Sequence, residues 1–294
     1  IGMGDEVICP DVTFAATAAA IVYTGADPIF LDIDEETLGL SAEKVEAFLE
    51  HNTREINGKR INKVTGKHVK ACMAMHNIGF SVEIDSLEKI CLRYNLLLIE
   101  DAAEALGSRI GNKMLGTFGC VGVYSFNGNK IITTGGGGAL VTDSKDLFDR
   151  AFHLSTTAKV PHPFEYEHDA IGYNYRMPSI NAALGVAQLK MIEEFLEIKR
   201  NQIELLKTLL NKKCFSVVMP KYGISNNWFF MIRINRKDFN IQSLITSLGR
   251  SGIMARTLWS RISKMKPYQK YIATDNKVAD KVLDQVLCLP NGVV

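Results

Sequence analysis

Short apolar runs alternate with longer segments of helical periodicity through the first half of the chain. An apolar run bounded by polar or turn residues is typical of a buried strand, and the sequence predicts such strands over 6–9, 27–33, 69–75, 96–99 and 121–126. The segments between them predict helices over 13–23, 41–49 and 84–94. Strands that alternate with helices form βαβ units, so the pattern predicts an α/β fold with a mostly parallel sheet.

Local signals refine three segments of this half. Ser41 is predicted to begin its helix as a capping box. The polar and basic segment 52–67 predicts an exposed loop or hairpin, and its charges are more typical of a solvated surface than of a binding patch. The β-prone segment 131–134 leads into the glycines 135–138, which no GKS/T follows, so they are not a P-loop. A turn into the next strand and a close approach to a ligand are both open readings of these glycines.

A different organisation follows residue 143. The sequence predicts a helix over 145–154 and then a long irregular loop up to residue 178, rich in aromatic and polar residues. Such long loops are usually functional. Ser179 is predicted to cap the longest helix of the chain, which extends to residue 211 and connects two domains.

The last third of the chain predicts a smaller α/β unit. Its elements are a strand over 228–234 and helices over 241–248 and 277–287. We therefore expect a large domain over 1–190 and a small domain over 191–294.

Composition narrows the class of protein. The chain has 294 residues, of which 47% are hydrophobic and 22% charged, as in ordinary globular proteins. A net charge of +2, without a basic block interleaved with aromatics, argues against a nucleic-acid partner. The six cysteines show no CxxC spacing, which favours reduced thiols over disulfides or a zinc site and predicts a cytoplasmic location. No apolar stretch approaches the roughly 18 residues of a membrane span, and no signal-peptide pattern is present.

Candidate chemistry lies at the ends of two predicted strands. Asp101 follows the apolar run 96–99, and Lys130 follows the strand 121–126 in a loop of small and polar residues. A lysine and an acid most often form a structural salt bridge. A lysine in a desolvated pocket can instead bond a carbonyl carbon, and an aspartate can then stabilise the ring nitrogen of pyridoxal 5′-phosphate (PLP). His76, at the end of the strand 69–75, is equally consistent with a pocket residue and with a structural histidine.

Four motifs, in this order along the chain, support the reading of Lys130 and Asp101 as residues of a PLP site. GDEVICPDVTF lies near the start, EDAAEALGS and SFNGNKIITTGGGG lie in the middle, and GYNYRMPSINAALG lies downstream. Together they resemble the nucleotide-sugar aminotransferases of the DegT/StrS type, over almost the whole chain. The resemblance implies a fold-type-I PLP-dependent transferase, with an α/β/α large domain around a mostly parallel sheet and a small C-terminal α/β domain.

The resemblance also implies a role for each matching residue. Lys130 would carry PLP covalently and act as general acid and base, while Asp101 would hold the ring nitrogen protonated. Phe14 would stack on the ring, although a core role is common for a phenylalanine. The cofactor phosphate would bond the Ser125 hydroxyl and Asn174 of a neighbouring subunit, which makes a homodimer with shared sites the expected assembly.

Two positions depart from the family pattern. Glu104 stands where relatives often have Gln or His beside the ring hydroxyl, and Asn127 stands where many have His. These departures bear on the substrate more than on the chemistry. The resemblance implies no metal ion.

The resemblance points to glutamate as amino donor and to a nucleotide-linked keto sugar as acceptor. The motifs HLSTTAKVPH and NGKRINKVTGK favour UDP-4-keto-6-deoxy-N-acetylglucosamine, an intermediate of surface glycans, and GDP-4-keto-6-deoxymannose of perosamine synthesis is the alternative. Sugar dehydratases of the same fold replace the catalytic lysine by histidine, so Lys130 argues against them. A non-catalytic regulator or an inactive fragment is the remaining alternative, because such proteins normally carry a further N-terminal segment and a last helix.

Overall fold

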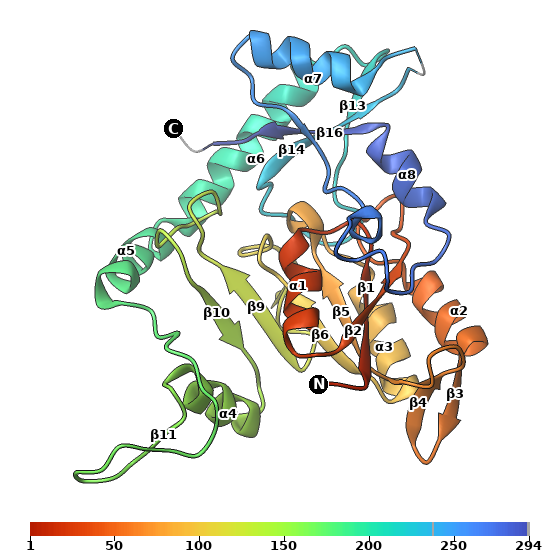
Figure 1. Ribbon diagram of the computed structural model, residues 1–294. Helices are drawn as coiled ribbons and strands as arrows, with labels where there is room; N and C mark the ends of the chain where they lie inside the picture. Colours follow the sequence, from red (N-terminus) through yellow and green to blue (C-terminus); the bar gives the residue numbers. More distant parts are fainter. Residues whose placement is uncertain (237, 293–294) are drawn as a thin grey trace.

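The computed structural model describes residues 1–236 and 238–292. Its centre is an eight-stranded sheet with the order β10-β9-β6-β5-β1-β2, to which β4 and β3 are joined through β5 (Figure 1). The strands are β1 (Asp5–Pro10), β2 (Asp27–Leu31), β3 (Thr53–Ile56), β4 (Lys59–Asn62), β5 (His68–Met75), β6 (Leu97–Asp101), β9 (Val121–Ser125) and β10 (Gly138–Val141). β2, β1, β5, β6 and β9 are parallel, so their carboxyl ends meet at one edge, and β10 is antiparallel to β9.

Helices cover both faces of this sheet. They are α1 (Ala15–Tyr23), α2 (Ala42–Asn52), α3 (Ile84–Tyr94) and α4 (Lys145–Ser155). Successive residues of a strand point to opposite faces. Accordingly, Ile8 belongs to a core with Leu87 of α3, whereas Val7 belongs to a core with Ile21 of α1. This arrangement confirms the α/β/α layers and the mostly parallel sheet.

The capping box predicted at Ser41 is wrong, although the helix begins there. The Ser41 hydroxyl accepts a hydrogen bond from Lys44 N at 3.3 Å, as an N-cap residue does. A capping box also needs Glu or Gln at the third helical position, and that position is Lys44. The predicted hairpin is confirmed, because β3 and β4 pair antiparallel.

The long helix predicted over 179–211 is two helices. They are α5 (Ser179–Leu189) and α6 (Ile192–Leu209). Met191 N donates to Gln188 O at 3.0 Å, a tighter turn that ends α5. The N-cap of α5 is Pro178, so the cap predicted at Ser179 is wrong by one residue.

A four-stranded antiparallel sheet forms the top of the molecule in Figure 1. Its elements are β13 (Phe215–Val217), β14 (Phe229–Ile234), β15 (Arg256–Thr257) and β16 (Val286–Pro290), with α7 (Ile241–Arg250) and α8 (Lys277–Leu283). The helix predicted over 277–287 ends at Leu283, because residues 286–290 pair with β14 and β15. Residues 131–134, predicted as β-prone, form no strand, and β10 begins at Gly138. The remaining short elements are β7 (Arg109–Ile110), β8 (Lys113–Met114), β11 (Lys159–Val160), β12 (Glu167–His168), η1 (Asn77–Gly79) and η2 (Ile262–Lys264).

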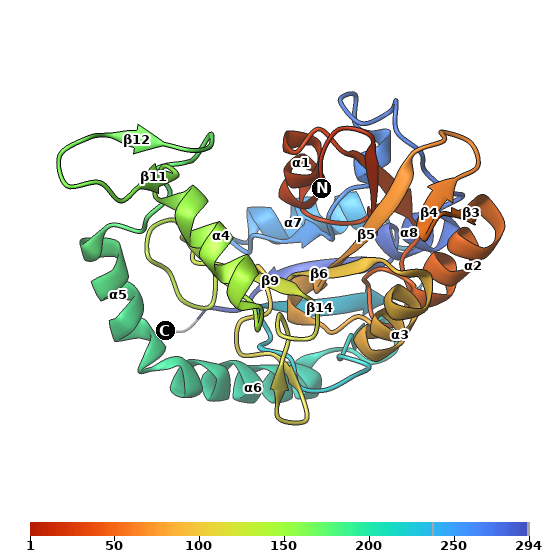
Figure 2. The same cartoon turned by 90° about the horizontal axis from the view of Figure 1, so that it is seen from below.

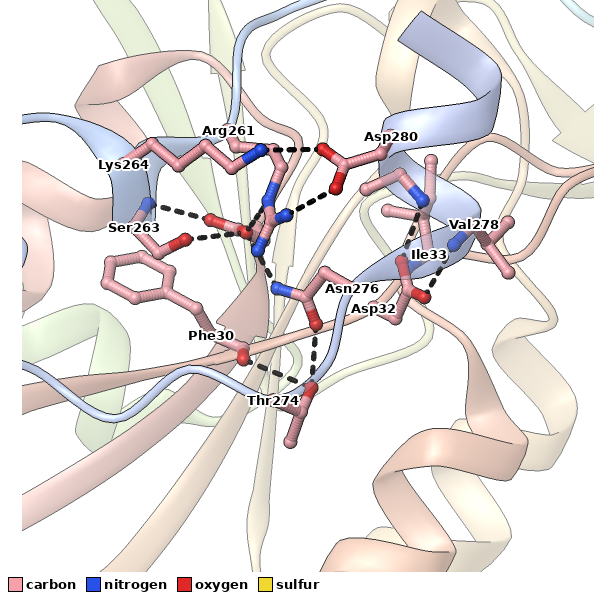
Figure 3. A network of polar contacts seen from close by, with 12 residues as sticks. Phe30, Asp32, Ile33, Arg261, Ser263, Lys264, Thr274, Asn276, Val278 and Asp280 are labelled. Atoms are coloured by element: carbon pink, nitrogen blue, oxygen red, sulfur yellow. Dashed lines mark hydrogen bonds and ion pairs between the residues drawn. The ribbon is translucent and has the colours of Figure 1, made fainter.

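A buried polar cluster fastens the C-terminal region to the large sheet (Figure 3). Asp11, fully buried after β1, accepts hydrogen bonds from Arg261 Nε at 2.7 Å, Ser263 N at 2.7 Å and Asn276 Nδ2 at 2.6 Å. The backbone of Phe30 in β2 also bonds Ile272 O and Thr274 N. The segment after β15 therefore packs on the large sheet, and the division at residue 190 stays a prediction.

No helix in the described part of the chain is long and apolar enough to cross a membrane.

Candidate active site

A cavity of about 500 Å³ opens at the carboxyl edge of the parallel strands. The ends of β5, β6 and β9 form its floor, α1 forms one wall, and the indole rings of Trp228 and Trp259 close it from the C-terminal region. Ligands of open α/β sheets bind at this edge. The candidate residues that line the cavity are Phe14, Asp101, Glu104, Ser125, Asn127 and Lys130.

Lys130 projects into this cavity from the loop after β9. Its Nζ lies 3.6 Å from Glu104 Oε1 and 4.0 Å from the centre of the Trp228 ring. Trp228 is held in place because its Nε1 donates to Asn129 O at 2.5 Å. Burial lowers the pKa of the Lys130 amine, while the charges of Glu104 and Asp101 act in the opposite direction. Such an amine loses its proton more readily than a surface lysine.

Asp101 is the last residue of β6 and forms the acidic floor of the cavity. Its Oδ2 accepts a hydrogen bond from the Thr17 hydroxyl at 2.7 Å, and its Oδ1 accepts one from Ala103 N at 3.1 Å. The Thr17 hydroxyl is in turn 2.7 Å from that of Thr13. These contacts fix the orientation of the carboxylate toward the cavity.

Glu104 is only 3% exposed, and its two oxygens are in different environments. Oε2 accepts a hydrogen bond from Ile78 N at 2.8 Å. Oε1 faces Lys130 and has no hydrogen-bond partner among the described residues, and neither has the nearby Trp259 Nε1. Burial raises the pKa of Glu104 to about 7, although the positive charge of Lys130 opposes the rise.

The backbone beside Glu104 is strained. Ile78 has φ 57°, the left-handed region in which a β-branched residue is rare. A conformation of this kind costs about 1–3 kcal/mol and persists where the surroundings enforce it. Here it directs the Ile78 amide at the Glu104 carboxyl.

Phe14 and Ser125 both line the cavity. Phe14 is 51% exposed and meets Trp259 edge-on, with ring centroids 5.2 Å apart. A large aromatic ring this exposed is not a core residue. The Ser125 hydroxyl accepts a hydrogen bond from Asn127 N at 3.3 Å and faces the cavity mouth.

Asn174 is the predicted site residue that the chain does not bring to Lys130. It lies in the loop before α5, where it pairs with Thr156 in an isolated β-bridge, and it does not line the cavity. Its expected role lies in a neighbouring subunit, so it stays a prediction.

His76 is a structural histidine rather than a pocket residue. Its Nε2 lies 2.9 Å from Glu100 Oε2, both side chains are fully buried, and neither lines the cavity. Glu100 also accepts hydrogen bonds from the backbone of Gly116, Phe118 and Gly119. This pair fixes the loop after β8 rather than a ligand.

The turn predicted for residues 135–138 is confirmed, and the close approach of these glycines to a ligand stays a prediction. Gly138 begins β10, and Gly137, with φ 94°, lines the cavity. The left-handed conformation of Gly137 suits glycine and brings the backbone near the site.

Sequence reasoning did not assign Thr17, Trp228 or Trp259 to the site. Thr13 and Thr17 are four residues apart, which places them on one helix face and is a weak signal. The two tryptophans come from the C-terminal region, far along the chain from Lys130, and no local pattern marks them.

A known protein family matches almost the whole chain. The model of the DegT/DnrJ/EryC1/StrS aminotransferase family matches residues 1–293. The chain belongs to this family. Its members use PLP, which confirms the expected enzyme class and cofactor.

Individual relatives agree with this membership. The chain is 34% identical to EpsN of Bacillus subtilis (strain 168), a candidate pyridoxal phosphate-dependent aminotransferase, over 98% of this chain and 73% of EpsN. It is 42% identical to the GDP-perosamine synthase of Escherichia coli O157:H7 over 72% of this chain, which spans 53% of that protein. The structure of PseC, an aminotransferase of pseudoaminic acid biosynthesis from Helicobacter pylori, superimposes with a TM-score of 0.85 at 27% identity and covers 97% of this chain and 74% of PseC.

The cavity fits PLP by the chemistry of its residues. It offers an amine in Lys130, a buried carboxylate in Asp101, and beside them a carboxyl oxygen of Glu104 that has no hydrogen-bond partner among the described residues. A buried polar atom without a partner is uncommon in a native structure, and a bound ligand group is one of its explanations. Phe14 supplies an exposed aromatic face.

Proposed function

We propose that this protein moves an amino group from glutamate to a nucleotide-linked 4-keto-6-deoxy sugar. The observation that carries the proposal is the meeting of the Lys130 amine, the Asp101 carboxylate and the Glu104 carboxyl in one cavity. Family membership supports amino transfer as the chemistry, and the specific donor and acceptor are our inference.

Each residue has a role that follows from its position. PLP, when bound, supplies an electron sink that allows an amino group to be exchanged for a carbonyl oxygen. Lys130 would anchor the cofactor and carry the proton that leaves and returns to the substrate carbon. Asp101, held by Thr17, would stabilise positive charge on the ring nitrogen. Ser125 would hold the phosphate, and Phe14 would hold the ring.

We also propose a homodimer with shared sites, in the cytoplasm. A groove of about 940 Å³ runs between β10, α4 and the loop before α5. Large apolar side chains in and beside it are exposed, among them Leu140, Phe148, Phe152, Tyr173, Tyr175 and Ile180. The β11–β12 segment projects from the body next to them (Figure 2). An exposed apolar surface of this extent is typical of an interface between subunits.

Mixing two impaired variants tests the shared site. Lys130→Ala lacks the amine, and Asn174→Asp places a negative charge where the partner's phosphate is proposed to bind. In a mixed dimer, one site combines the wild-type Lys130 of one subunit with the wild-type Asn174 of the other. We expect activity to return on mixing, and light scattering to show dimers. If the mixture stays as inactive as its components, Asn174 does not act across subunits.

Two nucleotide-linked sugars are candidates for the amino acceptor. The motifs of the chain favour UDP-4-keto-6-deoxy-N-acetylglucosamine, and the 42% identity to a GDP-perosamine synthase favours GDP-4-keto-6-deoxymannose. Incubation with glutamate and each sugar in turn, with the amino sugar detected by mass spectrometry, decides between them. We expect an amino sugar from one of the two and about 100-fold less from the other. If neither sugar gives an amino sugar, this substrate class is rejected. The amino sugar made from either acceptor would serve the synthesis of surface glycans.

A further inference from the structure

Lys130 and Glu104 form an ion pair unlike the other lysine pairs of the described residues. Their side chains are 13% and 1% exposed, whereas the other lysine–carboxylate pairs have a lysine at least 35% exposed. Burying two full charges is costly unless hydrogen bonds satisfy both groups. Glu104 Oε1 has no such bond from any residue that the structure describes, so the charged form of this pair is poorly compensated.

The geometry holds one carboxyl oxygen ready for a proton. Oε2 is committed to the Ile78 amide at 2.8 Å, and the strained backbone of Ile78 fixes that bond. Oε1 is therefore directed at Lys130 Nζ, 3.6 Å away. It can accept a proton without breaking an existing hydrogen bond.

Other titratable groups around the pair are few. From β6, the Asp101 carboxylate acts to raise the pKa of both Glu104 and Lys130. From β16, the Cys288 thiol has a pKa raised to about 12, chiefly by burial, and stays protonated. The remaining neighbours do not titrate in this range. They are the Thr17 hydroxyl on Asp101, the Ile78 amide and the Trp228 and Trp259 rings, and of these the Ile78 amide and Trp259 act to lower the pKa of Glu104.

We propose that Glu104 is the proton partner of the Lys130 amine. An N–H bond of the Lys130 ammonium breaks, an O–H bond forms on Glu104 Oε1, and the electron pair left on Nζ becomes free to bond a carbonyl carbon. The pair carries no net charge before or after the transfer, and no other reactant is needed. The free amine thus arises by direct transfer, in which no water molecule takes part, and the same proton can return to it. The inference rests on the proposed function only in taking Lys130 as the reacting amine.

The test follows each group separately in the protein without added cofactor. The reactivity of Lys130 toward acetic anhydride, read by peptide mass spectrometry against the exposed Lys264, gives the amine midpoint as a function of pH. Infrared difference spectra against Glu104→Gln give the protonated carboxyl of Glu104. Glu104→Gln keeps an oxygen for the Ile78 amide, and Lys130→Met keeps the chain length, so circular dichroism of both variants should match the wild type.

We expect reciprocal shifts. Glu104→Gln removes a negative charge and should increase Lys130 labelling at a fixed pH below its midpoint by about 10-fold or more. Lys130→Met should raise the Glu104 midpoint by the same amount, because coupling between two sites is reciprocal. In the wild type near neutral pH, the protonated carboxyl band and a reactive Lys130 should be present together. An ionised Glu104 beside an unreactive Lys130 at that pH, or a midpoint that either substitution leaves unchanged, would overturn the inference.

A parallel readout separates this inference from the proposed function. Borohydride reduction after addition of PLP should leave the cofactor mass on Lys130. Absence of that mass would reject the proposed function, and the titrations would still decide the proton exchange. Presence of the mass with unshifted titrations would reject the proton exchange alone.

Discussion

Two buried polar clusters lie at the carboxyl ends of the parallel strands, and they differ in how completely their groups are hydrogen-bonded. In the Asp11 cluster, Arg261, Ser263 and Asn276 satisfy both carboxylate oxygens. In the Lys130 cavity, Glu104 Oε1 forms an ion pair with Lys130 Nζ at 3.6 Å but has no hydrogen-bond partner within the described part of the chain. Both clusters join the large sheet to the C-terminal region.

The difference separates a structural role from a chemical one. A fully satisfied buried network fixes packing, and the loss of one member leaves the others unpaired. A partly satisfied network weakens the fold and is retained where a ligand completes it. The same substitution in the two clusters should therefore have opposite consequences for stability and for turnover.

The largest effect on stability is expected for Asp11→Asn. It removes the charge of the fully buried Asp11 that pairs with the half-buried Arg261. Breaking a buried pair costs about 3–5 kcal/mol of unfolding free energy, and we expect the lower end of this range, about 3 kcal/mol, because Arg261 keeps Asp280 as a partner. Urea unfolding measures the loss, and turnover below the unfolding transition should stay near that of the wild type. Stability equal to the wild type would contradict a structural role for this cluster.

Asp101→Asn makes the matched change in the cavity. The variant should retain some PLP but lose turnover by about 100-fold to 1000-fold, since the ring nitrogen loses its stabilising charge. Steady-state rates with glutamate and the keto sugar give the effect, and urea unfolding should show a smaller loss of stability than for Asp11→Asn. Near-normal turnover would remove Asp101 from the mechanism.

The pH dependence of stability distinguishes the cavity from the Asp11 cluster. The pKa of Glu104 is about 7 in the folded protein, above its ordinary value of 4.5. A raised pKa adds stability below the unfolded value and loses it as pH rises through the folded value. Unfolding free energy relative to Glu104→Gln should thus fall by about 3 kcal/mol between pH 4.5 and 7. A difference that is flat with pH would mean that Glu104 titrates normally.

The smallest effect is expected for Thr17→Val. The variant loses the hydroxyl that donates to Asp101 Oδ2, and a hydrogen bond to a charged group contributes about 1.5–3 kcal/mol. We expect turnover to fall by roughly tenfold, with Thr13→Val as the control one step further from the carboxylate. Equal effects of the two substitutions would argue against a specific role for Thr17.

Local patterns predicted the first half of the fold well. The helix expected over 84–94 is α3, and the apolar runs became β1, β2, β5, β6 and β9, because each period matched the face that its element buries. The ends of two buried strands marked Asp101 and Lys130 only weakly, and the resemblance of the surrounding motifs to a known family singled them out.

Local sequence patterns did not predict the features that depend on contacts between distant residues. The helix predicted over 277–287 overlaps the start of β16, because pairing with β14 and β15 makes residues 286–290 a strand. The bond from Thr17 to Asp101 crosses 84 residues, and Trp259 reaches the cavity through the packing of the segment after β15. His76 and Glu104 look alike in sequence as polar residues near strand ends, and only their partners distinguish a satisfied side chain from an open one.

The central claim is that the Lys130 cavity binds PLP and uses it to accept an amino group. The most direct measurement is the absorption spectrum of the protein with added PLP, before and after glutamate, beside Lys130→Ala. The account predicts a visible band in the wild type that glutamate removes and that Lys130→Ala lacks. Identical spectra for the two proteins, unchanged by glutamate, would contradict it.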